Sequence, residues 1–350
     1  MTEENKLITE RKKKLETIKL TDKAYPNTFR KKDYTDKIRD EYKDIEKENL
    51  SEKNVSVSIA GRLLTIRNMG NSSFANLHDD SGNIQIYLQK KQVGEENYSL
   101  FNNLDLGDIV AINGVLFKTK TGELTVNTTS IMLLSKSLRP LPEKFHGIAD
   151  IEIKYRQRYL DLMINPETKN LFKTRSRIIS LIRDFFIKDD YLEVETPMMH
   201  MIPGGAAAKP FVTHHNSLDL DLYLRIAPEL FLKRCIIGGY EKVFEINRSF
   251  RNEGLSVKHN PEFTMIEFYC AYQDHVYLML LIENLFDNII SSLNLGSKFK
   301  YQDYEINFKA PFLKIKFYDA IEKYAANIDI SKLDDKDYVE AYCSENGITV

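Results

Sequence analysis

The chain has 350 residues, of which 43% are hydrophobic and 29% charged, a composition typical of a soluble globular protein with two or three domains. Its 49 Lys and Arg residues against 51 Asp and Glu residues exclude a uniformly basic nucleic-acid binder, although a local basic patch is compatible with them. The three cysteines have no metal-ligand spacing, and neither a signal segment nor a run of 18 apolar residues occurs. We therefore expect a reduced, cytoplasmic protein that is neither exported nor inserted in a membrane.

Residues 1–54 are dense in charges of both signs, and their apolar positions are sparse. This pattern predicts one or two surface helices rather than a core. Two interpretations stay open for the segment: a solvated helical extension, or a basic rim that meets an RNA backbone.

The hydrophobic period changes to two from residue 55 onwards. Five short strands separated by Gly and Asn turns follow from this alternation, with a helix near residues 97–104 between the third strand and the fourth. This count and order predict a small closed barrel of the OB type over residues 55–138.

One face of the third strand carries aliphatic residues, which leaves Gln85 and Tyr87 on the other face. Phe74, in a neighbouring strand, joins Gln85 there if its side chain points outwards. An aromatic ring that stacks on a base and an amide that reads its edge suit the recognition of single-stranded RNA. The alternative is that Phe74 belongs to the core and Gln85 is merely solvated.

Two prolines, a glycine and the lack of periodicity mark residues 139–150 as a linker before a region spanning 151–350. A broad apolar stripe then predicts a long amphipathic helix over residues 173–188. The strand after it contains Pro197, and a proline cannot donate to a β-ladder, so this strand belongs at an edge. An edge strand behind a long helix fits a subunit interface, although packing within one subunit is equally compatible.

Two stretches of alternating residues, KVFEINRSF and EFTMIEFYCAY, flank a charged loop at 249–263. The alternation of the second stretch places Glu267 and Tyr269 on the same face as Phe263. Burying a glutamate is costly unless a cation meets it. That cation is either an arginine of the chain itself or a cationic ligand.

The loop carries groups that suit a nucleotide. Arg251 can grip phosphate oxygens in a bidentate manner, and His259 and Lys258 add donors. Phe263 offers a flat apolar face to a purine. Neither a P-loop nor a strand-linked GxGxxG motif occurs, so side chains on an antiparallel sheet would hold the phosphates. Such a clamp would stabilise the charge that develops during attack at a phosphate.

Two further stretches suit a small ligand. PGGAAAKPF at 203–211 has little bulk and allows close approach of a ligand to the backbone. RIAPELFLKR at 225–234 predicts a helix that begins near Pro228, with Glu229 in its first turn. A helix N-terminus favours a carboxylate, and the alternative is that Glu229 binds an amino group.

Several of these stretches resemble the class II aminoacyl-tRNA synthetases. FRNEGLSVKHNPEFTMIEFY resembles motif 2 of that class, and TRSRIISLIRDFFIKDDYLEVETP resembles motif 1, its dimer-forming element. KFHGIADIEIKYRQRYLDL, PGGAAAKPF and THHNSLDLDLYLRIAPELFLKR are similar to the bacterial-type lysyl-tRNA synthetases in particular. The resemblance implies an α+β chain, in which an OB-fold barrel that binds the anticodon precedes a partial class II catalytic domain built on an antiparallel sheet.

The family resemblance also implies a reaction, the ligation of L-lysine to tRNA(Lys) with ATP and Mg²⁺, and a homodimer whose interface includes Pro197. The lysine carboxylate first attacks the α-phosphate of ATP, which gives lysyl-adenylate and pyrophosphate. The terminal ribose hydroxyl of the tRNA then attacks the acyl carbon. Neither step needs a covalent enzyme intermediate, so positioning and charge neutralisation supply the rate.

Roles for individual residues follow from the same resemblance. Arg251 would be the catalytic residue that holds the α-phosphate of ATP and the substrate carboxylate. The other implied ATP-binding residues, the last of them stacked on adenine, are Glu253, His259, Asn260 and Phe263. The implied lysine-binding residues are Gly205 and Glu229 at the α-amino group, and Glu267 and Tyr269 at the ε-ammonium. The residues matched to positions that read the U-rich anticodon are Phe74, Gln85 and Glu123.

The sequence departs from the family pattern after motif 2. No segment resembles motif 3, the Gly-rich element that ends in an ATP-binding arginine, and the late acidic residues that hold Mg²⁺ are not found. We therefore expect a chain truncated before motif 3, with weak or no aminoacylation. The alternative function is a non-catalytic fragment that binds the tRNA anticodon. The aspartyl and asparaginyl enzymes fit less well, because Glu229 and Glu267 place negative charge where an acidic substrate would lie.

Overall fold

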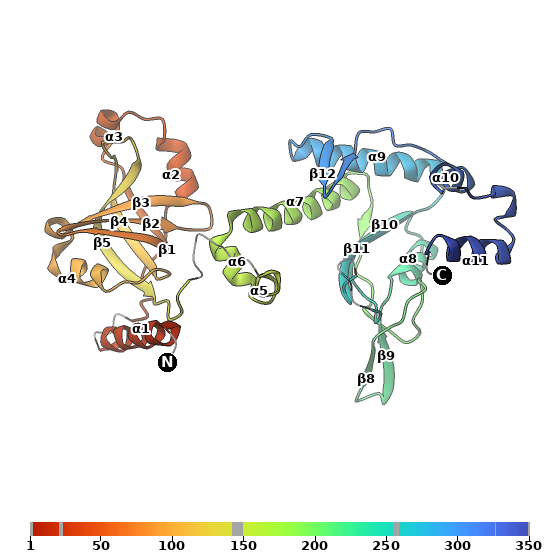
Figure 1. Ribbon diagram of the computed structural model, residues 1–350, viewed down its shortest axis with the longest axis horizontal. Helices are drawn as coiled ribbons and strands as arrows, with labels where there is room; N and C mark the ends of the chain where they lie inside the picture. Colours follow the sequence, from red (N-terminus) through yellow and green to blue (C-terminus); the bar gives the residue numbers. More distant parts are fainter. Residues whose placement is uncertain are drawn as a thin grey trace. The chain divides into compact units, whose positions relative to one another are not determined.

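The computed structural model describes residues 3–20, 24–141, 150–254, 256, 259–325 and 327–348. Contacts divide the chain into two compact units, Met1–Thr168 and Lys169–Val350 (Figure 1). The linker expected at 139–150 lies mostly outside the described residues, so the boundaries inferred from the sequence stay predictions.

A closed five-stranded barrel forms the centre of the first unit, with the strand order β1-β2-β3-β5-β4 (Figure 1). β3 pairs in parallel with β5, and the other neighbouring strands pair antiparallel. The strands are β1 (Ser56–Met69), β2 (Ser72–His78), β3 (Asn83–Gln89), β4 (Ile109–Lys118) and β5 (Leu124–Ser135). The number of strands predicted from the alternation is confirmed, and so is the helix between the third strand and the fourth.

The helix between β3 and β4 is longer than the sequence predicted. α4 spans Lys90–Asn102, and Gly94, at φ 83°, breaks its helical geometry near the start. A glycine tolerates this positive φ. Because glycine in a sequence indicates a helix break, the first turn of α4 was not predicted.

The described part of the segment before the barrel contains three helices instead of the one or two expected: α1 (Glu3–Lys19), α2 (Thr35–Tyr42) and α3 (Lys47–Lys53). The expectation that they contribute no core was wrong, since Ile38 and Leu50 are buried in the hydrophobic cluster of the barrel. The few apolar residues of these helices suffice to pack them on the barrel, because the barrel supplies the rest of the apolar surface. Arg11 ties α1 down by donating to the backbone oxygens of Ser137 and Arg139.

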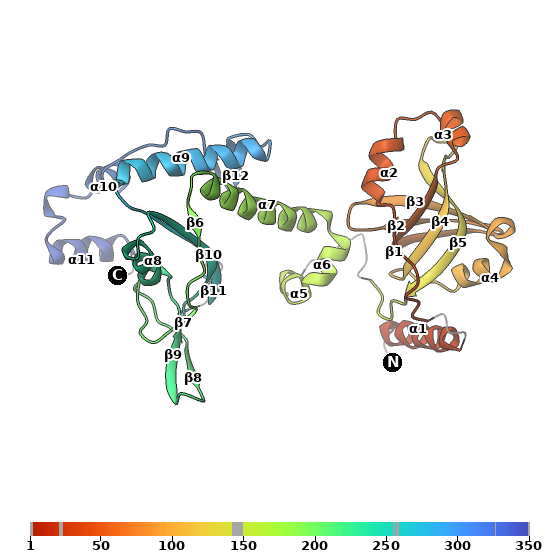
Figure 2. The same ribbon diagram turned by 180° about the vertical axis from the view of Figure 1, so that it is seen from behind.

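The second unit is built around a long hairpin, β10 (Lys242–Phe250) and β11 (Glu262–Cys270), with β6 (Leu192–Glu193) parallel to β10. α7 (Pro166–Lys188) and α9 (His275–Ser292) run across the same part of the hairpin (Figure 2). They share one core with it, in which the ring of Phe186 stacks on Phe244 at 5.2 Å and packs with Leu281. One face of the hairpin is therefore packed against these two helices.

A second three-stranded sheet, in the order β7-β9-β8, and a separate hairpin accompany the long one. α8 lies in sequence between β9 and β10. The remaining elements are α5 (Ile151–Arg156), α6 (Arg158–Ile164), β7 (Met199–His200), β8 (Val212–His215), β9 (Leu220–Leu224), α8 (Glu229–Ile237), β12 (Lys298–Tyr301), β13 (Tyr304–Asn307), α10 (Phe317–Tyr324), a 3₁₀ turn (Ile330–Lys332) and α11 (Lys336–Glu345).

The strand expected around Pro197 is shorter than predicted: β6 lies at the edge of its sheet, as expected, but it ends before Pro197. Residues 194–198 have no strand pairing, and Pro197 lies between the two-residue strands β6 and β7. A proline removes a ladder donor, which fits both the end of the strand before Pro197 and the place of that strand at a sheet edge. Its carbonyl is used locally, because Nε2 of His200 donates to it at 2.9 Å.

Candidate active site

The hairpin sets two glutamates opposite each other, since its register pairs Glu245 with Glu267. Glu245 is 1% exposed, and the equally buried Arg225 donates to its Oε1 at 2.7 Å. The hydroxyl of Thr196 donates to its other oxygen, also at 2.7 Å. The arginine of the chain itself therefore neutralises Glu245 rather than Glu267.

Glu267 accepts a hydrogen bond of 2.7 Å from the hydroxyl of Tyr269 on the same strand face. Within the described parts of the chain, no Arg or Lys forms an ion pair with it. Burial raises the pKa of Glu267, the Tyr269 hydroxyl lowers it, and the negative charges of Glu229 and Glu245 raise it further. Burial and the neighbouring Glu267 also raise the pKa of Tyr269, so that its proton is retained. Glu229, Glu245 and Glu267 lie close together, and the ion pairs with Arg225 and Lys233 neutralise only two of these three carboxylates, which favours a cationic ligand.

Gly205 and Glu229 lie side by side. α8 begins at Glu229, directly after Pro228, as the sequence predicted. Gly205 has φ +90°, and a Cβ atom placed on it would lie 2.9 Å from Cβ of Glu229 and 3.3 Å from Cβ of Ala227. Only glycine permits this backbone conformation together with this close approach. The predicted partners of an α-amino group are thus brought together, close enough to Glu267 for Glu229 to raise its pKa.

Arg251 follows directly on β10, and its guanidinium carbon lies 5.2 Å from the centre of the Phe263 ring. Its Nε is buried and has no hydrogen-bond partner among the described residues. The backbone N–H of Arg251 donates to the carbonyl of Pro261 at 2.9 Å and closes the base of the loop. A buried donor without a partner costs free energy, so this guanidinium is suited to an anionic ligand.

The loop that carries Glu253 is attached to the segment that carries Gly205. The backbone N–H of Asn252 donates to the carbonyl of Lys209 at 2.7 Å. The N–H of Lys209 in turn donates to Oε1 of Glu253 at 3.3 Å. Two predicted ligand-binding segments are therefore joined by hydrogen bonds to the backbone of Lys209.

The other predicted nucleotide residues lie on the returning arm of the loop. Nδ1 of His259 is 2.8 Å from the hydroxyl of Ser256, and Asn260 is exposed. In the described structure, neither of these two side chains forms a hydrogen bond with Arg251. Lys258, predicted as a phosphate donor, lies outside the described residues.

The barrel carries its aromatic residues on the outer face. The rings of Phe74 and Tyr87 lie 4.6 Å apart, and both side chains are only half-buried, so Phe74 is not a core residue. Gln85 shares this face, and the hydroxyl of Thr125 donates to its Oε1 at 2.9 Å. Glu123 is exposed in the turn before β5, where its backbone carbonyl also accepts a hydrogen bond from Thr125.

Sequence reasoning missed two residues that belong to these sites. Oδ1 of Asn127 is buried without a hydrogen-bond partner in the described structure, and the register pairs Asn127 with Tyr87 on the outer face of the barrel. The alternation of LTVNTT places Asn127 on the face of Thr125, and this signal could have identified it. Lys233 forms an ion pair of 2.6 Å with Glu229, one helical turn away, which the i,i+4 spacing could have shown.

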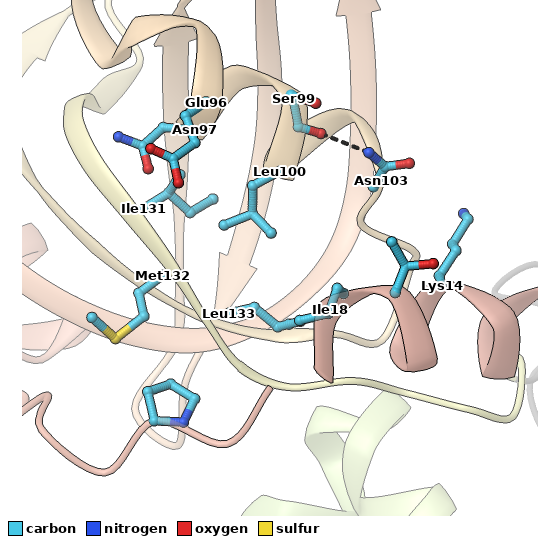
Figure 3. Close-up of a pocket in the computed structure, with 12 residues that line it drawn as sticks. Lys14, Ile18, Glu96, Asn97, Ser99, Leu100, Asn103, Ile131, Met132 and Leu133 are labelled. Atoms are coloured by element: carbon cyan, nitrogen blue, oxygen red, sulfur yellow. Dashed lines mark hydrogen bonds between the residues drawn. The ribbon is translucent and has the colours of Figure 1, made fainter. Parts of the chain in front are cut away.

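A cavity of about 490 Å³ lies in the first unit between α1, α4 and β5 (Figure 3). Leu100 and Met132 give it an apolar wall, and the residues predicted for function do not line it. Its polar side chains are used by the fold: Lys14 forms an ion pair, and Asn103 donates to the backbone oxygen of Ser99, shown dashed in Figure 3. This cavity is separate from both predicted sites.

Two kinds of feature are absent from the described residues. No helix there has the length and apolar character needed to cross a membrane. No group of three or more His, Cys, Asp and Glu side chains in those ranges is arranged to hold a metal ion.

Comparison with known proteins gives matches in both units. The family described as tRNA synthetases class II (D, K and N) matches residues 150–347, and the OB-fold nucleic acid binding domain matches residues 57–134. A protein of Nitrosomonas europaea named lysine–tRNA ligase is 51% identical over 348 residues, which are 99% of this chain and 69% of the relative. Proteins of the same name from Thiobacillus denitrificans and Neisseria meningitidis serogroup A are 51% and 50% identical, over 68% and 69% of their lengths. The chain belongs to the class II tRNA synthetases, in the group of the lysine–tRNA ligases.

Proposed function

We propose that the chain activates L-lysine with ATP to lysyl-adenylate and transfers the lysyl group to tRNA(Lys). The observation that carries this proposal is the presence of two glutamates on neighbouring elements. Glu229, on α8, lies beside Gly205, and Glu267, on β11, lies beside Tyr269. Lysine carries two ammonium groups, one for each position. An acidic substrate would add a third negative charge to the same pocket, which Coulomb repulsion disfavours.

The α-ammonium of lysine binds to Glu229 and to the carbonyl of Gly205 in this proposal. The ε-ammonium binds to Glu267 and to the hydroxyl oxygen of Tyr269. Discrimination follows from burial, because a substrate without the ε-ammonium leaves the half-buried Glu267 carboxylate unpaired. The structural support is the surplus of negative charge around Glu267, which no arginine in the described ranges neutralises.

ATP binds to the loop between β10 and β11. Arg251 holds the α-phosphate and the lysine carboxylate, since its buried Nε has a free donor and its guanidinium is fixed above the Phe263 ring. Adenine stacks on the other face of Phe263. Glu253, His259 and Asn260 position the nucleotide.

The reaction then needs no nucleophile from the protein. The lysine carboxylate oxygen attacks the α-phosphorus, the bond to the bridging oxygen breaks, and pyrophosphate leaves. Arg251 stabilises the charge that builds up on the α-phosphate oxygens. In the second step the terminal ribose hydroxyl of the tRNA attacks the acyl carbon, and AMP leaves.

Mg²⁺ is expected to accompany ATP, since it neutralises phosphate charge. The residues that the structure describes do not supply a carboxylate cluster for it.

The anticodon of the tRNA binds to the outer face of the barrel through Phe74, Gln85 and Glu123. The support is the half-buried pair of aromatic rings, which offers a stacking surface beside a polar amide. The domains we propose are a helical extension at 1–54, the barrel at 55–138, a linker at 139–150 and a catalytic domain at 151–350.

A homodimer and a cytoplasmic location complete the proposal. Leu171 and Phe172 expose apolar surface on α7, the helix that resembles motif 1, and a second copy of the chain would cover it. Pro197 would lie in the same interface. Sedimentation of the chain tests the dimer, with Leu171→Glu as the variant expected to shift it towards the monomer.

The activity is tested by ATP–pyrophosphate exchange with lysine, aspartate and asparagine in parallel. Exchange that depends on lysine alone supports the proposal, and exchange with aspartate contradicts it. A chain that shows no exchange but binds tRNA(Lys) through its barrel would favour the alternative, a non-catalytic anticodon-binding protein. The control is Arg251→Ala, which should abolish exchange and leave tRNA binding to the barrel unchanged.

A further inference from the structure

The pocket proposed for lysine already contains an ammonium group of the chain itself. Nζ of Lys233 lies 2.6 Å from Oε1 of Glu229, the residue assigned to the α-amino group of the substrate. The two residues are one turn apart on α8, so the helix itself brings the side chains together.

The same ammonium reaches the second half of the pocket. Nζ of Lys233 lies 6.0 Å from the centre of the Tyr269 ring, whose hydroxyl donates to Glu267. Its positive charge lowers the pKa of Glu267, against burial and the neighbouring glutamates. Lys233 thus acts on both carboxylates that the substrate would use.

Two ammonium groups on one carboxylate repel each other, so lysine and Lys233 compete for Glu229. The Lys233 side chain is 53% exposed and can move into solvent. A partly exposed i,i+4 ion pair is weak, so a bound ligand can displace it at small cost. Glu229 is less exposed, at 31%, and stays in place against Gly205.

We propose that Lys233 is a resident counter-ion of Glu229, which the α-ammonium of the incoming lysine displaces. This inference rests on the proposed role of Glu229. Lys233 forms an ion pair with the Glu229 carboxylate when no ligand is bound. Removal of the Lys233 ammonium group should therefore make lysine bind more tightly. A ligand without an α-ammonium does not displace it, so the removal of Lys233 should not tighten the binding of such a ligand.

The test compares two ligands on the 350-residue chain by isothermal titration calorimetry: L-lysine, and 6-aminohexanoate, which is lysine without its α-amino group. Lys233→Met should lower the Kd of lysine about threefold relative to the Kd of 6-aminohexanoate, as expected when a weak competing ion pair is removed, because the effect of the Lys233 charge on Glu267 is shared by both ligands. Lys336→Met, which breaks an exposed i,i+4 pair with Glu340 on α11, is the matched control and should change neither value.

A double-mutant cycle separates this inference from the proposed function. Glu229→Gln alone should weaken lysine binding and leave 6-aminohexanoate unaffected; if lysine binding is unchanged, the role of Glu229 is wrong, and the inference fails with it. In the Glu229→Gln background, Lys233→Met should not change the ratio of the lysine Kd to the 6-aminohexanoate Kd. If Glu229→Gln behaves as expected but Lys233→Met in the parent chain leaves this ratio unchanged or raises it, the displacement is wrong while the proposed function stands.

Discussion

The hydroxyl of Tyr269 donates a hydrogen bond of 2.7 Å to Oε1 of Glu267, two residues before it on the same strand face. The bond fixes the carboxylate within the pocket and opposes the rise in its pKa that burial causes. Glu267 thereby keeps a larger share of its charge at neutral pH than burial alone would allow.

Tyr269→Phe removes this donor and little volume. The pKa of Glu267 should rise further, and lysine affinity should fall about tenfold, the effect of losing a hydrogen bond to a charged group. Titration of lysine binding against pH checks both effects, since the midpoint of the acid limb should move to higher pH. Tyr272→Phe, at a fully accessible ring 90% exposed, is the control and should leave the midpoint unchanged.

Glu267→Gln should abolish most lysine binding and spare ATP binding. The same substitution should not lower the stability of the fold. Because the pKa of Glu267 is raised in the folded state, its ionised form is disfavoured there, and this cost is present above the folded pKa and absent below the unfolded one. The variant should therefore be at least as stable as the parent chain at neutral pH and equal to it near about pH 4.

Denaturant unfolding at the two pH values, with separate lysine and ATP titrations, measures these quantities. An equal loss of both affinities would show that Glu267 has a structural role. A loss of stability at neutral pH would contradict the charge argument.

Gly205→Ala should damage the lysine site through a specific contact. The new Cβ atom would lie 2.9 Å from Cβ of Glu229, so the helix start or the loop has to move. We expect lysine affinity to fall at least about tenfold and stability to fall by about 1–3 kcal/mol from the strained backbone. Gly239→Ala is the matched control, because its φ of +105° is equally unfavourable but nothing lies within 4 Å of its Cβ position. Similar losses of lysine affinity in the two variants would exclude the contact with Glu229 as the cause.

Phe74→Ala should weaken the binding of tRNA(Lys) by about 1–3 kcal/mol, the range for one stacked base. Lysine-dependent exchange should not change, because the residue lies in the barrel unit. Met69→Ala, an exposed residue at the end of β1, serves as the control for apolar surface. A large fall in the melting temperature instead of in tRNA affinity would mean that the ring acts mainly by packing against Tyr87.

The parts of the fold that depend on local periodicity could be predicted from the sequence. The alternation in NIQIYLQ placed Ile84 and Ile86 inside the barrel and Gln85 outside, and the structure shows this arrangement. The loop between β10 and β11 was also located correctly, because both strands alternate without interruption. Period-two signals are strong where one face of a strand is buried.

Features that depend on long-range contacts could not be predicted. Ile38 and Leu50 look like isolated apolar residues on charged helices, and only the barrel beneath them explains their burial. An arginine of the chain was one of the two cations considered for Glu267, and the structure pairs the buried Arg225 with Glu245 instead. The packing of three separate segments decides which of the two facing glutamates forms the ion pair with the arginine. The spacing of residues along the chain does not contain that information.

The backbone link between Lys209 and the loop at Asn252 and Glu253 has a thermodynamic consequence. It joins the segment that shapes the lysine site to the segment that shapes the nucleotide site, so a ligand that orders one segment reduces the entropy cost of ordering the other. We expect lysine and a non-hydrolysable ATP analogue to bind with positive cooperativity, and independent affinities in calorimetry would contradict this. The coupling must be reciprocal: the factor by which lysine raises the affinity for the nucleotide is the factor by which the nucleotide raises the affinity for lysine.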